Sequence, residues 1–282
     1  MIGIGPADPR YPRPLLDLAA PPDPLWVDGD ARILARRALA VVGTRRMTPY
    51  GARIAREIAV WCVDAGFVVV SGLAQGVDSS AHDGALEAGG STVAVLGAGV
   101  ARYLAEVRGR RRRLAHGIRE RGALLSEFPP DAPPQKWTFA QRDATIAALG
   151  VATIVVEAPL GSGALITAVE ARKLRRPVYA VPGPIGVAAS AGTNALIATG
   201  GARALVGRGG LDELLGSSDR RTADDASDVD SRILEALAAA PADPDGLARR
   251  MGMNVPALSA HVARLLMRGM VVTAADGRLV RR

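Results

Sequence analysis

Residues 68–101 constrain the fold of this chain more than any other stretch, because they read as strand, glycine turn, helix and strand. The apolar run at 67–70 has no polar alternation, and a second apolar run follows at 93–96. Such continuous runs are typical of strands covered on both faces, as in a parallel sheet. Glycines and polar residues fill the turn at 71–76, and a helical pattern follows it. A glycine turn that leads into a helix N-terminus is a natural place to bind a phosphate.

The same alternation of short apolar runs and helical patterns extends from residue 39 to residue 206. It predicts six or seven strands separated by helices, which is the pattern of an open parallel α/β sheet. Ligands bind such sheets beyond the carboxyl ends of the strands. Those ends carry Gly43, Ser71, Gly72, Gly97, Glu127, Glu157, Pro182 and Gly183. We therefore expect these residues along one edge of the sheet.

Composition divides the chain into four parts. Residues 1–38 are proline-rich and are expected to form an arm packed on the main domain, 39–215. The polar residues 216–229 are expected to be a linker. Residues 230–282 show three amphipathic helical patterns and then a hairpin turn, which predicts a winged helix. Its arginines Arg249, Arg250 and Arg264 are candidates for meeting DNA, although small winged helices also bind proteins.

Positive charge is the main compositional clue to a partner. The 282-residue chain has a formal net charge of +7, nearly all of its cations being arginine, and this permits a polyanionic partner. Charge is densest at Arg108 and 110–113, inside a stretch, 102–121, that is expected to be helical. This run is either a solvated face or a track for a nucleic-acid backbone. Trp137 and Phe139 either pack in the core or stack on bases.

Other features of the composition exclude whole classes of site. The single cysteine, Cys62, excludes a disulfide framework and a Cys-based zinc site within one chain, and the three histidines suggest no metal site. No N-terminal signal peptide is visible, and no apolar run reaches the roughly 18 residues of a membrane helix. We expect a cytoplasmic protein with no membrane association.

The residues at the sheet edge favour a phosphate-binding crevice. Each glycine alone is expected to serve a tight turn, but the set lies beside Arg45 and Arg142, whose guanidinium groups fork onto phosphates. The hydroxyls of Ser71, Ser162 and Thr167 would add donors. Neither a G-x-G-x-x-G fingerprint nor a Walker motif is present.

Four titratable side chains in this region have two readings. His82 follows Asp78 by one helical turn, so the two either form an acid–base pair or the histidine only fixes the helix against its turn, which is the reading we favour. Glu127 and Glu157 are either catalytic carboxylates or acceptors for the backbone N–H groups of a neighbouring loop, and the sequence leaves these two readings open.

Several motifs occur together along the chain. They are Tyr11-Pro12, Val42-Gly43-Thr44-Arg45, Ser71-Gly72-Leu73-Ala74-Gln75-Gly76-Val77-Asp78, Leu124-Leu125-Ser126-Glu127-Phe128-Pro129, Val155-Val156-Glu157-Ala158, Ser162-Gly163-Ala164-Leu165-Ile166-Thr167, Val181-Pro182-Gly183 and Gly192-Thr193-Asn194. With the terminal winged helix, they make nearly the whole chain resemble the DNA-processing protein A (DprA, or Smf) family.

The resemblance implies an extended Rossmann-like parallel sheet that binds single-stranded DNA, followed by a small C-terminal winged-helix domain. It also implies a homodimer that acts as a recombination mediator and loads the RecA recombinase on incoming DNA in natural transformation. No cofactor and no enzymatic activity are expected. The expected nucleic-acid-binding residues are Gly43, Arg45, Arg46, Ser71, Gly72, Gln75, Gly76, His82, Gly97, Arg142, Ser162, Gly163, Thr167, Pro182, Gly183 and Asn194.

This chain departs from the family's pattern within that site. The family usually has Arg at the position of Gln75, and its Arg-Asn-Arg appears here as Arg142, Asp143 and Ala144. Its Tyr-Pro-x-x-Asn segment is lost after Tyr103. We expect the arginines at 110–113 to compensate by supplying charge nearby.

Two other functions stay open. The related Rossmann proteins include nucleotide- or phosphoribosyl-binding enzymes such as phosphoribohydrolases, but their P-G-G-x-G-T-x-x-E motif is missing from the nearest stretch, 159–164. Hydrolysis of AMP would favour that class. A regulator that reads duplex DNA would instead bind duplex and single strands equally through residues 229–282 alone.

Overall fold

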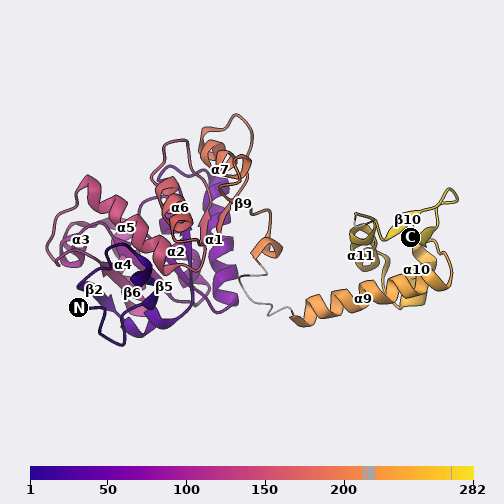
Figure 1. The fold of residues 1–282 in the computed structure, drawn as a ribbon, viewed down its shortest axis with the longest axis horizontal. Coiled ribbons are helices and arrows are strands. Elements are labelled where there is room, and N and C mark those ends of the chain that lie inside the picture. Colours follow the sequence, from indigo (N-terminus) through magenta and orange to yellow (C-terminus); the bar gives the residue numbers. More distant parts are fainter. Residues whose placement is uncertain (212–213, 215–219, 268) are drawn as a thin grey trace. The chain divides into compact units, whose positions relative to one another are not determined.

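A computed structural model describes residues 1–282 except 212–213, 215–219 and 268. The chain separates into two compact units, Met1–Leu215 and Gly216–Arg282 (Figure 1). The boundary after Leu215 coincides with the predicted end of the main domain.

The first unit is built on one large sheet of nine described strands. Its spatial order is β1-β2-β6-β5-β4-β3-β7-β8-β9, and neighbours from β6 through to β9 pair in parallel. The strands are β1 (Ile2–Ile4), β2 (Leu25–Gly29), β3 (Ala38–Val42), β4 (Val68–Ser71), β5 (Thr92–Leu96), β6 (Ala123–Ser126), β7 (Thr153–Val155), β8 (Val178–Ala180) and β9 (Arg203–Ala204). The predicted extended Rossmann-like parallel sheet is confirmed.

The N-terminal arm extends this sheet instead of only packing on it. β1 and β2 pair antiparallel, and β2 pairs antiparallel with β6, with Val27 opposite Leu125. Between them lies η1 (Arg13–Asp17), and after them η2 (Ala31–Ala35), which Asp30 caps by accepting from the N–H of Arg32. The hydroxyl of buried Tyr11 donates to the carbonyl of Pro22 and closes the arm on itself.

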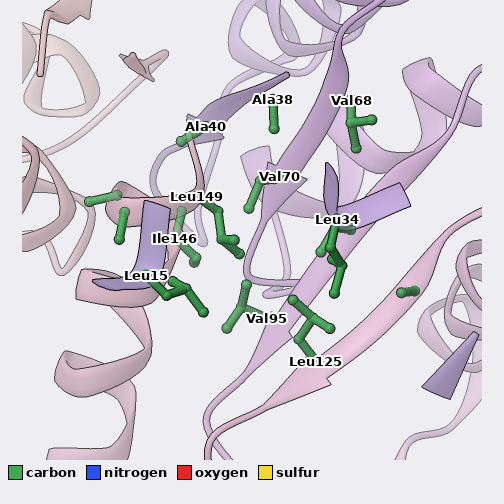
Figure 2. Packing of buried hydrophobic residues seen from close by; sticks show 14 of the residues in the cluster. Leu15, Leu34, Ala38, Ala40, Val68, Val70, Val95, Leu125, Ile146 and Leu149 are labelled. Carbon is green, nitrogen blue, oxygen red and sulfur yellow. The ribbon is translucent and has the colours of Figure 1, made fainter. Parts of the chain in front are cut away.

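Helices cover both faces of the sheet because the strand residues alternate between two cores. Ala38, Ala40 and Val42 face the core that η1, α5 and α6 close (Figure 2), and Leu39 and Val41 face the core under α1 and α2. The helices among the described residues of this unit are α1 (Pro49–Asp64), α2 (Val77–Glu87), α3 (Val100–Glu106), α4 (Gly109–Arg121), α5 (Lys136–Leu149), α6 (Ala164–Lys173) and α7 (Ala188–Ala198), with η3 (Arg208–Leu211). A three-layer α/β/α arrangement follows from this two-residue period.

One local prediction for the first unit needs correction. The stretch 102–121 is not one helix, because α3 ends at Glu106 and α4 begins only at Gly109, which adopts φ 61°.

The second unit is a three-helix domain with a β-wing. Its elements are α9 (Arg220–Ala239), α10 (Pro244–Met251), α11 (Val255–Met267), β10 (Val271–Thr273) and β11 (Leu279–Arg281). Buried Ile233, Leu247, Leu258 and Leu265 form its core, and β10 pairs antiparallel with β11 across the predicted turn, where Gly277 has φ 80°. The winged helix is thus confirmed. The expected linker at 216–229 needs correction from Arg220 onward, which is helical, while 216–219 lie outside the described residues.

Candidate nucleic-acid interface

The sheet changes direction of winding between β3 and β7, and an open cleft lies at that point. These two strands are adjacent and parallel, yet the chain continues from them to opposite ends of the sheet. The switch cleft, as we call it, has a volume of about 850 Å³. Its walls include Gly43, Thr44, Arg45, Arg46, Asp78, Lys136, Phe139, Arg142, Asp143, Ser162, Gly163 and Thr167. The crevice predicted for the carboxyl edge therefore exists, and it gathers seven of the predicted residues.

Two further clefts continue from the switch cleft. The lateral cleft, about 290 Å³, is lined by Arg45, Gly72, Gln75, Gly97, Tyr103, Glu106, Arg111, Phe139 and Arg142. The α4 cleft, about 580 Å³, is lined by Arg45, Arg46, Gln75, Gly76, Ser79, Arg108, Arg110 and Arg111. Arg45 lines all three, so the clefts share one corner of the molecule.

Arg45 and Arg46 are exposed cations in the turn that follows β3. Neither makes an ion pair with any residue that the structure describes. The turn is rigid, because Thr44 donates its N–H to the carbonyl of Glu157 and its hydroxyl accepts from the N–H of Arg46. Two unpaired guanidinium groups are thus held at the edge of the switch cleft, where an anion would meet them first.

Arg142 is a buried cation, in contrast. Only 6% of it is exposed, and its Nη1 lies 3.2 Å from Asp143 Oδ1 and 3.8 Å from Asp78 Oδ2. Asp78 also accepts from the backbone N–H groups of Gly72 and Ala74 at 3.2 and 3.4 Å. Asp78 therefore anchors both the 72–76 turn and Arg142, and it does not pair with His82.

Phe139 lies between the two arginines. The guanidinium carbon of Arg45 is 5.5 Å from the ring centroid, and that of Arg142 is 5.9 Å from it. Both distances are within the range of a cation–π interaction. The half-buried ring lies between the exposed arginine and the buried one and lines both the switch cleft and the lateral cleft.

Three of the predicted glycines serve close packing of this wall. A Cβ on Gly72 would overlap the Arg142 guanidinium, and one on Gly97 would lie 2.7 Å from the Phe139 ring. Gly76 has φ 91°, and a Cβ there would meet the backbone of Thr44 and Arg45. These glycines leave room for side chains and backbone of the protein itself; only Gly76, with its positive φ, has the turn conformation expected of each single glycine.

Two predicted contact residues are inaccessible in this fold. Ser71 has no exposed surface and donates its hydroxyl to the carbonyl of Val41 at 2.7 Å. His82 is also fully buried, with Nδ1 2.7 Å from the hydroxyl of Thr92. Because that hydroxyl donates to Val69 O, Nδ1 must carry the proton, and burial lowers the pKa of His82 to about 3. Both residues are structural, which corrects the prediction that they contact nucleic acid.

A third group of predicted contact residues lies away from the switch cleft, namely Pro182, Gly183 and Asn194. The Asn194 side chain brackets Gly183, accepting from its N–H at 3.0 Å and donating to its carbonyl at 2.9 Å. Pro182 and Gly183 line a separate cavity of about 450 Å³, which shares no lining residue with the switch cleft. The fold does not bring these three residues together with Arg45.

The two candidate catalytic carboxylates are both engaged structurally. Glu157 accepts from the backbone N–H of Thr48 at 2.8 Å and from its hydroxyl at 2.6 Å. Glu127 accepts from Gln141 Nε2 at 2.8 Å and from the Thr145 hydroxyl at 2.6 Å. Glu157 thereby supports the N-cap of α1, as its second reading proposed, and Glu127 fastens α5 to the end of β6.

Sequence reasoning missed some residues of the clefts. Lys136, one of only two lysines, is exposed at the first position of α5 and lines the switch cleft. Gln135 and Thr138 form a capping box at the start of α5, and this pattern could have placed Lys136 at the first position of the helix. The arginines at 110–113 were expected to supply charge nearby, but the placement of Arg111 and Tyr103 in the lateral cleft depends on the break between α3 and α4.

In the winged helix, two of the three candidate arginines are already engaged. Arg250 donates to the carbonyls of Ala236, Ala240 and Pro241 at the end of α9. Arg264 lies 3.3 Å from Asp230, which His261 also contacts at 2.6 Å. These side chains hold the domain together.

Membrane and metal features are lacking from the part of the chain that the structure describes. None of its helices combines the length and apolar character needed to cross a bilayer. No cluster of three or more His, Cys, Asp or Glu side chains suited to a metal ion occurs among the same residues.

An open parallel sheet with a basic cleft at its switch point, joined to a winged helix, defines a two-unit α/β protein of the Rossmann-like class. Residues 3–213 match the family described as DNA recombination-mediator protein A, and residues 217–277 match the DprA winged helix domain. The chain belongs to the DNA recombination-mediator protein A family.

Curated relatives and solved structures agree with this assignment. Smf of Escherichia coli is 43% identical over 68% of this chain and 51% of its own length, and DprA of Bacillus subtilis is 35% identical over 67% and 63%. The chain spans about half the length of the first curated relatives it matches.

The structure of DprA from Streptococcus pneumoniae superposes with a TM-score of 0.69 at 33% identity, covering 76% of this chain and 74% of that one. That of DprA from Helicobacter pylori, described for its single-stranded DNA binding mode, gives 0.65 at 30% identity, covering 72% and 92%.

Proposed function

We propose that this protein binds single-stranded DNA along the switch cleft and its two neighbours, and acts as a recombination mediator. The observation that carries the proposal is the meeting of three clefts at Arg45, with Arg46, Lys136 and Arg111 exposed around it. Family membership and the single-stranded DNA binding of the Helicobacter pylori relative support the same ligand.

The chemistry of the switch cleft suits a phosphodiester backbone. Arg45 and Arg46 provide forked donors without internal ion pairs, and the α6 N-terminus after Gly163 adds backbone N–H groups and a positive dipole end. The Ser162 side chain lies on the same wall. Such contacts read charge and backbone rather than base identity, so binding without strong sequence preference is expected.

The wider role follows the family. We propose a homodimer in the cytoplasm that loads a RecA-type recombinase on incoming single strands during natural transformation. Support for a binding role over an enzymatic one comes from three carboxylates, Asp78 in the wall of the switch cleft and Glu127 and Glu157 outside it, which hold backbone or side-chain donors of the fold. No residue among these is left to activate water.

The proposed function is tested by a salt titration of oligonucleotide binding to the full chain. Single-stranded DNA is expected to bind more tightly than a duplex of equal length, with affinity falling as salt rises by about 0.7 log units per log unit of salt for each phosphate neutralised. Equal affinity for both, retained by residues 229–282 alone, would point to the winged-helix regulator, and release of adenine from AMP would point to the enzyme.

A second prediction concerns pH and Asp143. Burial raises the pKa of Asp143 to about 6, although Arg142 and Arg45 lower it and Asp78 and Glu170 add to the rise. A bound polyanion raises that pKa further, so binding takes up a proton and affinity falls as pH increases from 5.5 to 7.5. We expect a loss of roughly fivefold over that range, about 1 kcal/mol for one nearby charge.

Asp143→Asn is the matched variant for this effect. It keeps the shape but removes the carboxylate, so single-strand affinity at pH 7.5 should rise and most of the pH dependence should vanish. Fluorescence anisotropy with a labelled oligothymidylate measures both. An unchanged pH profile in the variant would mean that another group titrates.

A further inference from the structure

Helix α4 presents its arginines to the same corner of the molecule as Arg45. Arg108, Arg110 and Arg111 line the α4 cleft together with Arg45 and Gln75. Arg111 and Gln75 also line the lateral cleft, next to Gly97 and Arg142. Arg111 is therefore the arginine of α4 that borders both clefts.

The neighbouring charges leave Arg111 as the available cation of this group. Arg110 pairs with Asp83, and Arg108 donates to the carbonyls of Ala105 and Val107. Glu106, whose carboxylate lines the lateral cleft, forms an ion pair with Arg102, with Nη2 and Oε1 2.6 Å apart. Exposed Arg111 makes no ion pair or hydrogen bond with any residue that the structure describes.

A second observation points to a ligand at this place. The hydroxyl of Tyr103, in the lateral cleft with Arg111, is buried without a hydrogen-bond partner within the described part of the chain. Burial raises the pKa of Tyr103, which keeps its proton available for donation. Nε of Arg142, another residue that lines the lateral cleft, also lacks a partner among the described residues. Unsatisfied donors of this kind cost free energy unless an acceptor reaches them.

We propose that α4 continues the polynucleotide path beyond the switch cleft, with Arg111 and Tyr103 holding phosphate groups that follow those at Arg45. This inference rests on the proposed function, since it extends the binding path of the same single strand from the switch cleft to the surface of α4. It follows that Arg111 contributes only when the strand is long enough to leave the switch cleft.

Arg111→Ala tests this inference across a series of oligothymidylates from about 4 to about 20 nucleotides, the range of site sizes for such binders. We expect the variant to bind the longest strand about tenfold more weakly and the shortest almost as the wild type does, with the salt slope on the long strand lowered by about 0.7. Arg112→Ala and Arg113→Ala are matched controls, because they remove one charge from exposed positions of α4 that line neither cleft.

A rescue experiment distinguishes the loss of a contact between Arg111 and DNA from damage to the fold by the Arg111→Ala substitution. Gln75 borders the same two clefts as Arg111, so Gln75→Arg in the Arg111→Ala background should restore most of the affinity for the long strand. The proposed path along α4 would be wrong if Arg111→Ala lost no more affinity than Arg112→Ala. It would also be wrong if Arg111→Ala lost the same affinity for oligonucleotides of every length. If the wild type itself shows no preference for single strands, the proposed function fails instead.

Discussion

Replacing both Arg45 and Arg46 by alanine is expected to lower the affinity for a single-stranded oligonucleotide by about 100-fold or more, since each hydrogen-bonded charge contributes about 1.5–3 kcal/mol. Both guanidinium groups are exposed at the switch cleft and pair with no described carboxylate. The salt slope should fall by about 1.4, the share of two phosphates on a single strand.

The control for this prediction removes the same charge elsewhere. Arg112→Ala with Arg113→Ala also lowers the net charge by two, from positions outside the three clefts. The double variant Arg45→Lys with Arg46→Lys keeps the charge but cannot make the bidentate hydrogen bonds of guanidinium groups. It should therefore bind more tightly than the double alanine variant and more weakly than the wild type. If the double alanine variant and its control bind equally, net charge alone explains binding and the cleft does not.

Gly76→Ala is expected to lower the free energy of unfolding of the first unit by about 3 kcal/mol, from backbone strain and overlap together. The residue has φ 91° and ψ −134°, a conformation that side chains resist, and an added Cβ would lie 2.8 Å from both Cα and C of Arg45. The overlap is with backbone, so it cannot be relieved by a rotamer change. The displaced turn should also carry Arg45 out of position and weaken single-strand binding.

Gly89→Ala is the matched control for Gly76→Ala. Gly89 has φ 75°, but nothing lies within 4 Å of an added Cβ, so only the backbone strain of about 1 kcal/mol is expected. All three tryptophans, Trp26, Trp61 and Trp137, belong to the first unit. Urea unfolding followed by tryptophan fluorescence therefore reports that unit alone. Equal destabilisation by both substitutions would show that the turn yields to the new methyl group.

The sheet and its binding edge could be predicted because they depend on local patterns. Apolar runs such as 39–42 and 68–70 mark buried strands, and the carboxyl ends of parallel strands share an edge whatever the details of packing. Gly43 and Arg45 were therefore placed correctly in the switch cleft. Thr48, which accepts from the N–H of Gly51, and Pro49, at the first position of α1, are local signals of the same kind.

The direction of individual side chains at that edge depends on contacts far along the chain. Ser71 shares the strand face of Val69 and turns inward to Val41, 30 residues away. Asp78 finds Arg142 instead of His82, because α5 brings that arginine back over the 72–76 turn. The spacing of residues in the sequence does not predict such long-range pairs. Gly72, which leaves room for the Arg142 side chain, was therefore interpreted as part of a ligand site.

The two borders of the large sheet restrict how copies of this protein can associate. One border is β1, three residues long, and the other is β9, two residues long. Strands this short offer too few free N–H and C=O groups to recruit another chain into a continuous ladder. Any homodimer of this protein should therefore join through side chains on helices or loops, leaving each sheet, and the proposed DNA path along it, complete within one subunit.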